Sequence, residues 1–196
     1  TAIAGPDFTM PNPLSITINP GASTGVITVA TMDDTIDEPD TETFTVTLTS
    51  ATNATVVAVN ATGNGTVADN DNPPDLSIGN ATAVTEGGTS SFTVSLFAPG
   101  TSTPITSGKT ITVNFNVTSG TATTGTDFTM PSPLSITINP GASTGVITVA
   151  AIDDIIDESD ETFTVALTTA TNATVVAANA TGTGTINDND NPPDLS

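Results

Sequence analysis

The sequence repeats itself at a spacing of about 120 residues, and this tandem duplication constrains the fold more than any other feature. Residues 139–150 repeat residues 19–30 without a change. An extra residue near Thr41 shortens the offset by one, so that residues 188–196 repeat residues 69–77. A fixed period of this length indicates tandem copies of one domain, and every feature that recurs in phase belongs to that domain.

Acidic residues are concentrated rather than scattered. The 196 residues include 21 Asp and Glu against one Lys, with no Arg or His, and the net charge is -20. Eighteen of the acids lie in four stretches, at residues 33–42, 69–75, 153–161 and 188–194. Two carboxylates about 4 Å apart repel by roughly 4 kcal/mol at an effective dielectric near 20. Because one lysine cannot neutralise them, the stretches either stay solvated or bind cations from solution.

A solvated loop is the ordinary interpretation of an acidic run. Here the clusters recur in phase in both copies and lack basic partners, which favours metal binding, and calcium takes about 6–8 oxygen ligands. The negative charge repels phosphate and argues against nucleic acid as a partner. Without cysteine the chain has no disulfide or thiolate metal site. No apolar run approaches the roughly 20 residues that a membrane-spanning helix needs, so no membrane insertion is expected.

Apolar residues alternate with polar ones in short runs between Gly, Pro and Asn, and no run has a helical period. This pattern predicts an all-β chain of half-buried strands. Seven short strands in one copy predict an antiparallel, immunoglobulin-like β-sandwich with one core between two sheets. The strands are expected near residues 76–84, 92–96, 111–117, 134–138, 147–151, 163–167 and 183–187.

Paired prolines after Asn72 and Asn191 stiffen the chain and stop strand pairing, so we place domain boundaries there. Residues 75–193 form one complete module, and residues 194–196 begin the next. Residues 1–74 match only the last four strands of a module, and such a remnant exposes half a core and open strand edges. We favour a segment of a longer chain as the explanation; the alternative is that a neighbouring chain donates the strands that complete the first module.

Five motifs in order resemble the Calx-β domain, a family first described in sodium–calcium exchangers and common as tandem repeats in bacterial surface and adhesion proteins. The resemblance covers one whole module and the C-terminal part of another. It implies a seven-stranded sandwich that binds calcium at one end, near the junction with the next domain. The motifs are VTEGG at 84–88, GTATTGTDF at 120–128, NPG at 139–141, IDDIIDESDETF at 152–163 and GTINDND at 184–190.

The resemblance also implies a set of calcium ligands, carried over position by position. In the complete module they are Glu86, Asp153, Asp154, Glu158, Glu161, Asp188, Asp190 and the backbone carbonyl of Ile156. In the first module they are Asp33, Asp34, Glu38, Glu42, Asp69, Asp71 and the backbone carbonyl of Ile36. One ligand is lost at Ser119, where some family members carry an acid. The residue inserted near Thr41 shifts Glu38 relative to Glu42, so the two modules need not bind alike.

Other acids have simpler interpretations. Asp7 and Asp127 follow Gly-Pro and Gly-Thr, and we favour a turn-capping role for both over ligation. Asp75 and Asp194, directly after the prolines, either bridge to the next domain or stay solvated. The segment 188–192 also looks like the calcium-binding linker of cadherins, but their internal motifs need an Arg that this chain lacks. A standard EF-hand loop does not fit, because two prolines occupy ligand and glycine positions.

The sequence suggests three candidate functions. The first is a calcium-binding structural or adhesive repeat of an extracellular fibre or surface protein, in which calcium makes the module junctions rigid and the partners are neighbouring modules. The second is a module of an adhesin that binds a glycan, cell-surface or matrix ligand through rows of outward Thr. The third is an enzyme that uses paired acids such as Asp153 and Asp154. Without His, Cys or Tyr, the chain lacks the usual nucleophile and base pairs, and we expect no enzymatic activity.

Overall fold

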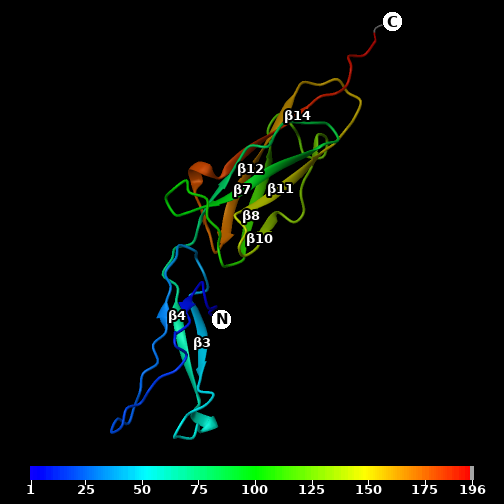
Figure 1. The fold of residues 1–196 in the computed structure, drawn as a ribbon. Helices are drawn as coiled ribbons and strands as arrows, with labels where there is room; N and C mark the ends of the chain where they lie inside the picture. Colours follow the sequence, from blue (N-terminus) through cyan, green and yellow to red (C-terminus); the bar gives the residue numbers. More distant parts are fainter. Residues whose placement is uncertain (195–196) are drawn as a thin grey trace. The chain divides into compact units, whose positions relative to one another are not determined.

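The computed structural model describes residues 1–194 and divides into two compact units (Figure 1). Unit 1 spans Thr1–Asp71 and unit 2 begins at Asn72. The expected start of a further module at residues 194–196 falls, apart from its first residue, outside the described residues.

Unit 2 is a sandwich of two five-stranded sheets. The first sheet has the order β10 (Ser135–Ile138), β8 (Ile111–Ser119), β12 (Glu161–Thr171), β14 (Thr181–Asn187) and β6 (Val84–Thr85). The second has the order β13 (Thr174–Val175), β5 (Asp75–Ile78), β7 (Thr89–Phe97), β11 (Thr144–Ala151) and β9 (Phe128–Thr129). Neighbours are antiparallel except for β6 with β14 and β5 with β13. The predicted all-β, sandwich-type fold is therefore confirmed.

The first predicted strand is in fact two strands in different sheets. The amide of Gly79 donates to Thr93 of β7 at 3.0 Å, whereas the amide of Ala81 donates to Thr183 of β14 at 3.1 Å. The chain thus crosses from one sheet to the other within three residues. The prediction of one continuous strand over 76–84 was wrong because apolar alternation cannot show which sheet each half joins.

Helical structure is confined to two short 3₁₀ turns among the described residues. They are η1 (Ala58–Asn60) in unit 1 and η2 (Ala177–Asn179) in unit 2, each just before the last strand of its unit. The two turns occupy corresponding positions of the repeat and differ in sequence only at Val59 and Ala178, so nearly the same local sequence forms the same turn twice. Within residues 1–194 no helix is long and apolar enough to cross a membrane.

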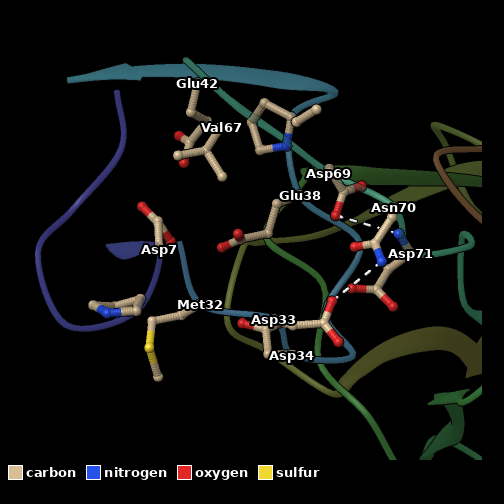
Figure 2. A pocket seen from close by; sticks show the side chains of 13 residues that line it. Asp7, Met32, Asp33, Asp34, Glu38, Glu42, Val67, Asp69, Asn70 and Asp71 are labelled. Carbon is tan, nitrogen blue, oxygen red and sulfur yellow. Dashed lines mark hydrogen bonds between the residues drawn. The ribbon is translucent and has the colours of Figure 1, made fainter. Parts of the chain in front are cut away.

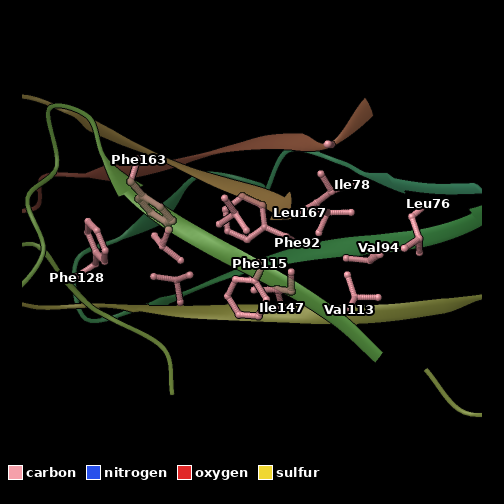
Figure 3. Close-up of a cluster of buried hydrophobic side chains, with 14 of the residues drawn as sticks. Leu76, Ile78, Phe92, Val94, Val113, Phe115, Phe128, Ile147, Phe163 and Leu167 are labelled. Carbon is pink, nitrogen blue, oxygen red and sulfur yellow. The ribbon is translucent and has the colours of Figure 1, made fainter. Parts of the chain in front are cut away.

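The core of unit 2 lies between its sheets, and its members alternate along the strands (Figure 3). On β8, residues Ile111, Val113 and Phe115 are buried while Asn114 and Asn116 are exposed. Phe163 of β12 stacks on Phe128 with ring centroids 4.8 Å apart. A side chain at Gly184 would collide with the Phe163 ring, since an added Cβ would lie 2.5 Å from it. Glycine at that position therefore makes room for the aromatic pair.

Unit 1 contains two two-stranded sheets. One pairs β1 (Phe8–Thr9) with β2 (Ala30–Thr31), and the other pairs β3 (Thr41–Thr47) with β4 (Thr62–Ala68). The ring of Phe44 stacks on Phe8 with centroids 4.7 Å apart, as their counterparts do in unit 2.

Two of the four strands expected in unit 1 do not form as predicted. Residues 15–18 are not in a strand, and residues 24–31 form one only at Ala30–Thr31. In unit 2 the corresponding strands β10 and β11 pair with β8 and β7. Residues 1–71 contain no counterparts of β7 and β8, and a strand without a pairing partner loses its ladder of hydrogen bonds.

We predict that Phe163→Ala lowers the free energy of unfolding of unit 2 much more than Phe44→Ala lowers that of unit 1. Phe163 is 1% exposed and touches two other rings, so its truncation should destabilise unit 2 by about 3–5 kcal/mol. Phe44 is only half-buried, and the loss in unit 1 should be clearly smaller. Urea unfolding followed by NMR signals of each unit measures both values, and equal losses would contradict the packing described above.

Candidate metal sites

Carboxylates converge at three places among the described residues. Within each group, one carboxylate oxygen per residue lies within 4.8 Å of the others. Cluster A is Glu86, Asp188 and Asp190; cluster B is Asp127, Glu158 and Glu161; cluster C, in unit 1, is Asp7, Glu38 and Glu42.

The parallel pairing of β6 with β14 builds cluster A. Thr85 lies opposite Asn187, and the amide of Glu86 donates to the Asn187 carbonyl at 3.1 Å. The residues that follow each strand, Glu86 and Asp188, are thereby placed side by side. One oxygen each of Glu86, Asp188 and Asp190 is buried without a hydrogen-bond partner among the described residues. Buried acceptors without a donor are costly, and a cation would satisfy all three.

The loop after β11 lies against cluster A. The Asp154 amide donates to the Glu86 carboxylate, and Asn189 Nδ2 donates to Asp153 Oδ1 at 3.3 Å. Gly87 is close enough to Asp153 that an added Cβ would lie 3.3 Å from the Asp153 Cβ. The structure therefore brings Asp153 and Asp154 to the edge of cluster A. No contact places the Ile156 carbonyl there; the Ile156 amide instead donates to Asp154 Oδ1 at 2.7 Å.

Cluster B joins a turn to the acidic loop. The Asp127 carboxylate accepts a hydrogen bond from the Thr123 amide at 2.5 Å, so the capping geometry is present. The same carboxylate also hydrogen-bonds with Glu161. The interpretation of Asp127 as a turn cap alone thus missed its position beside two predicted ligands. The signal in the sequence was that Asp7 and Asp127 recur in phase outside the four acidic stretches.

Ser119 lies near this turn, where some family members carry an acid. Its hydroxyl accepts a hydrogen bond from the Thr124 amide at 3.1 Å. It pairs with Phe163 across the β8–β12 ladder. The position therefore holds a structural hydrogen bond and contributes no carboxylate to cluster B.

Crowding of the acids changes their pKa values. Burial, the hydrogen bond with Asp127 and the charge of Asp127 raise the pKa of Glu161 to about 7. Burial also acts to raise the pKa of Asp127, but hydrogen bonds from the Thr123 amide, Thr126 and Glu161 outweigh it and lower the value. Of these two carboxyl groups, Glu161 is therefore the one that keeps its proton to higher pH. In cluster A, burial first and then the neighbouring carboxylates raise the pKa of Glu86 and Asp190.

Unit 1 gathers its acids around one small cavity (Figure 2). The cavity measures about 30 Å³, which is room for a water-sized particle. Figure 2 shows the carboxylates of Asp7, Glu38 and Glu42 turned toward one another. All six predicted side-chain ligands of the first module, together with Asp7, line the cavity: Asp33, Asp34, Glu38, Glu42, Asp69 and Asp71.

The two modules arrange their acidic loops alike. Asn70 donates to Asp33 at 3.1 Å, as Asn189 does to Asp153, and Ile36 donates to Asp34 at 2.7 Å. Glu38 and Glu42 meet in cluster C just as Glu158 and Glu161 meet in cluster B. The insertion near Thr41 therefore does not separate the two glutamates. Burial, followed by the charges of neighbouring acids, raises the pKa of Glu38 and of Asp71.

The family model of the Calx-beta domain matches this chain twice, at residues 1–73 and 69–190. The chain belongs to the Calx-beta domain family. The two matches follow the duplication seen in the sequence, and each includes the acidic loop and the acids after the last strand of its copy.

A solved Calx domain has a similar fold. The crystal structure of the apo form of the Calx CBD1 domain is 21% identical, with a TM-score of 0.50; the match covers 60% of this chain and 99% of that one. The structure of CBD12 from CALX1.2 is 20% identical with a TM-score of 0.49, over 59% of this chain and 46% of that one. The match thus spans about half the length of that relative. A search of curated protein sequences found no match.

The shifted pKa of Glu161 predicts how stability depends on pH when calcium is withheld. The value rises from 4.5 in the unfolded chain to about 7 in the folded one, so the folded state holds the proton more tightly. The associated stability is fully present below pH 4.5 and is lost as pH rises toward 7. Melting of the calcium-free protein should therefore fall across this window.

Glu161→Gln should weaken the dependence of the melting temperature on pH, since the neutral amide cannot titrate. Asp160→Asn is the matched control, because Asp160 is exposed and outside the clusters. Thermal melting by circular dichroism at half-unit pH steps measures both. A slope unchanged by Glu161→Gln would assign the pH dependence to other carboxylates.

Proposed function

We propose that this chain is a calcium-binding structural repeat, in which calcium holds the acidic loops of each module together. The observation that carries the proposal is cluster A. Three carboxylate oxygens are buried there side by side, without hydrogen-bond donors among the described residues. Such an arrangement is unfavourable by repulsion and by desolvation unless a cation is present. The ligands are oxygens alone, which suits a hard divalent ion, and the family is one of calcium-binding domains.

Each module would use two neighbouring groups of ligands. In unit 2, cluster A with Asp153 and Asp154 forms one group, and cluster B forms the other. In unit 1, cluster C would form one group of ligands, and the other carboxylates around the same cavity would form the second group. We retain the carbonyls of Ile36 and Ile156 as proposed ligands from the family resemblance, and we add Asp7 and Asp127. When bound, calcium would supply positive charge that offsets the repulsion among these carboxylates, Glu161 included.

Bound calcium would also make the exit from the module rigid. Asp188 and Asp190 come directly before Asn191, Pro192 and Pro193, and Asp69 and Asp71 come directly before the same tripeptide in the first copy. Holding these acids against the acidic loop fixes the direction in which the chain leaves the sandwich. Prolines then limit the bending of the next few residues. A tandem array of such modules would be stiff with calcium and flexible without it.

We place this repeat outside the cell, in a surface or adhesive fibre. Extracellular calcium modules bind at about 0.1–1 mM, a concentration range met outside cells. The chain has no cysteine, so bound calcium would take the stabilising role that disulfides have in many secreted domains. We propose no catalysis, because the chain lacks His and Cys and its paired acids are better used as ligands.

Calcium should raise the melting temperature, and chelation should reverse the effect. At a hundredfold excess over the dissociation constant, binding stabilises the folded state by about 2.7 kcal/mol per site. Differential scanning calorimetry with calcium, with magnesium and with a chelator measures the shift. Identical melting in all three conditions would refute the proposal.

Asp188→Asn with Asp190→Asn should reduce the calcium-dependent shift in the melting temperature of unit 2, to which cluster B would still contribute, while leaving that of unit 1 unchanged. The substitutions keep the size of the side chains but remove the charge that holds the ion. Asp157→Asn with Asp160→Asn changes the charge equally at exposed acids outside the clusters, and should retain the shift. Isothermal titration calorimetry counts the sites that remain. An unchanged number of sites after the first pair of substitutions would exclude cluster A as a ligand group.

A further inference from the structure

In each unit, an asparagine side chain ties the acidic loop to the acids that follow the last strand. In unit 2, Nδ2 of Asn189 donates a hydrogen bond to Oδ1 of Asp153 at 3.3 Å. In unit 1, Nδ2 of Asn70 donates to Oδ1 of Asp33 at 3.1 Å, as a dashed line in Figure 2 shows. Both asparagines stand in the sequence Asp-Asn-Asp, between two acids of the proposed site. The bond is therefore a feature of the repeated domain.

The asparagine supplies a hydrogen-bond donor among side chains that accept. An ionised carboxylate accepts hydrogen bonds but donates none, so two neighbouring acidic segments repel each other and cannot bond directly. A side-chain amide carries a donor and an acceptor and has no charge. An acid at position 189 would remove the donor and add a further negative charge. Asparagine is thus suited to joining two acidic segments before a cation binds.

Asp153 is the ligand that this bond positions in unit 2. The converging oxygens of cluster A come from Glu86, Asp188 and Asp190, whereas Asp153 is exposed at the edge of that group. The hydrogen bond attaches Asp153 to the segment between Asp188 and Asp190. It uses one oxygen of the Asp153 carboxylate and leaves the other for a cation, since each carboxylate has two. The bond thus holds the ligand in place without blocking it.

The other hydrogen bonds of the loop act differently. The Ile156 amide donates to Asp154 Oδ1 at 2.7 Å, a local bond that shapes the loop but does not attach it to another segment. The Asp154 amide donates to the Glu86 carboxylate and is a second attachment of the loop to cluster A. Loss of the Asn189 bond should therefore loosen the loop and open the bond between Asp154 and Glu86 more often.

We propose that Asn189 and Asn70 are positioning residues, which hold the acidic loops beside the strand-end acids before calcium binds. A loop that is ordered in advance lowers the free-energy cost of binding, because the ion does not have to order it. The inference rests on the proposed function, since it names residues that prepare the proposed site. Its main test uses the calcium-free protein, so the two can fail separately.

The test is Asn189→Ala in the full chain, studied by NMR with a chelator present. The Asp154 amide should exchange with solvent about fivefold faster, the factor that one hydrogen bond of typical net strength supports. The backbone order parameters of residues 152–158 should fall, and those of residues 33–38 in unit 1 should not change. Calorimetric titration with calcium should show an affinity of unit 2 that is lower by up to about the same factor.

The matched control is Asn191→Ala. It removes the same side chain two residues further along, at an exposed position outside the described hydrogen bond. The order of residues 152–158 and the exchange of the Asp154 amide should both stay as in the unsubstituted chain.

A second background separates the bond from any other effect of the substitution. Asp153→Ala removes the acceptor, so adding Asn189→Ala to it should change neither the exchange nor the order of the loop any further. An unchanged loop in calcium-free Asn189→Ala, or an equal effect in both backgrounds, would overturn the proposal. If the unsubstituted chain binds no calcium, the proposed function fails, whereas the exchange measurement still confirms or overturns the effect of Asn189 on the loop.

Discussion

The pairing of β12 with β8 is the interaction on which the closed sandwich depends. This ladder covers Phe163, Val165 and Leu167, and it brings the apolar side chains of β8 into the core. Where the ladder exists, in unit 2, both sheets have five strands and the core side chains are buried. In unit 1 the counterpart of β12 lacks such a partner among the described residues, and the same apolar side chains remain exposed.

The acidic loops depend much less on that ladder. Asp34 and Asp154 each accept a hydrogen bond from the amide two residues later, at 2.7 Å in both units. Asp7 and Asp127 each cap the turn that precedes them. These are local bonds between residues close in sequence, so both copies form them whether or not the sandwich is closed. Local structure therefore shapes the loops that carry the acids in both copies, although the acids of different segments meet only through the fold.

The alternation of apolar and polar residues predicted much of the strand arrangement of unit 2. Apolar alternation located the buried strands β7, β8, β11 and β12, because a half-buried strand needs a period of two. Apolar alternation gave a wrong prediction for residues 76–84. The sheet that a strand joins depends on distant partners such as Thr93 and Thr183, which the local pattern does not contain. The alternation failed again for residues 15–18 and 24–29, whose strand propensity is not realised without β8 and β7 beside them.

The sequence alone determined the repeat, the strand pattern and the two acidic segments of each module, because these are properties of local composition and spacing. Only the tertiary structure decided how the acids meet. The parallel pairing of β6 with β14 brings Glu86 to Asp188, across about 100 residues of sequence. The turn after β8 likewise brings Asp127 to Glu161, a contact that neighbouring residues do not reveal. Carboxylates far apart in the chain converge only when the sheets have formed, so the grouping of these acids is a property of the fold.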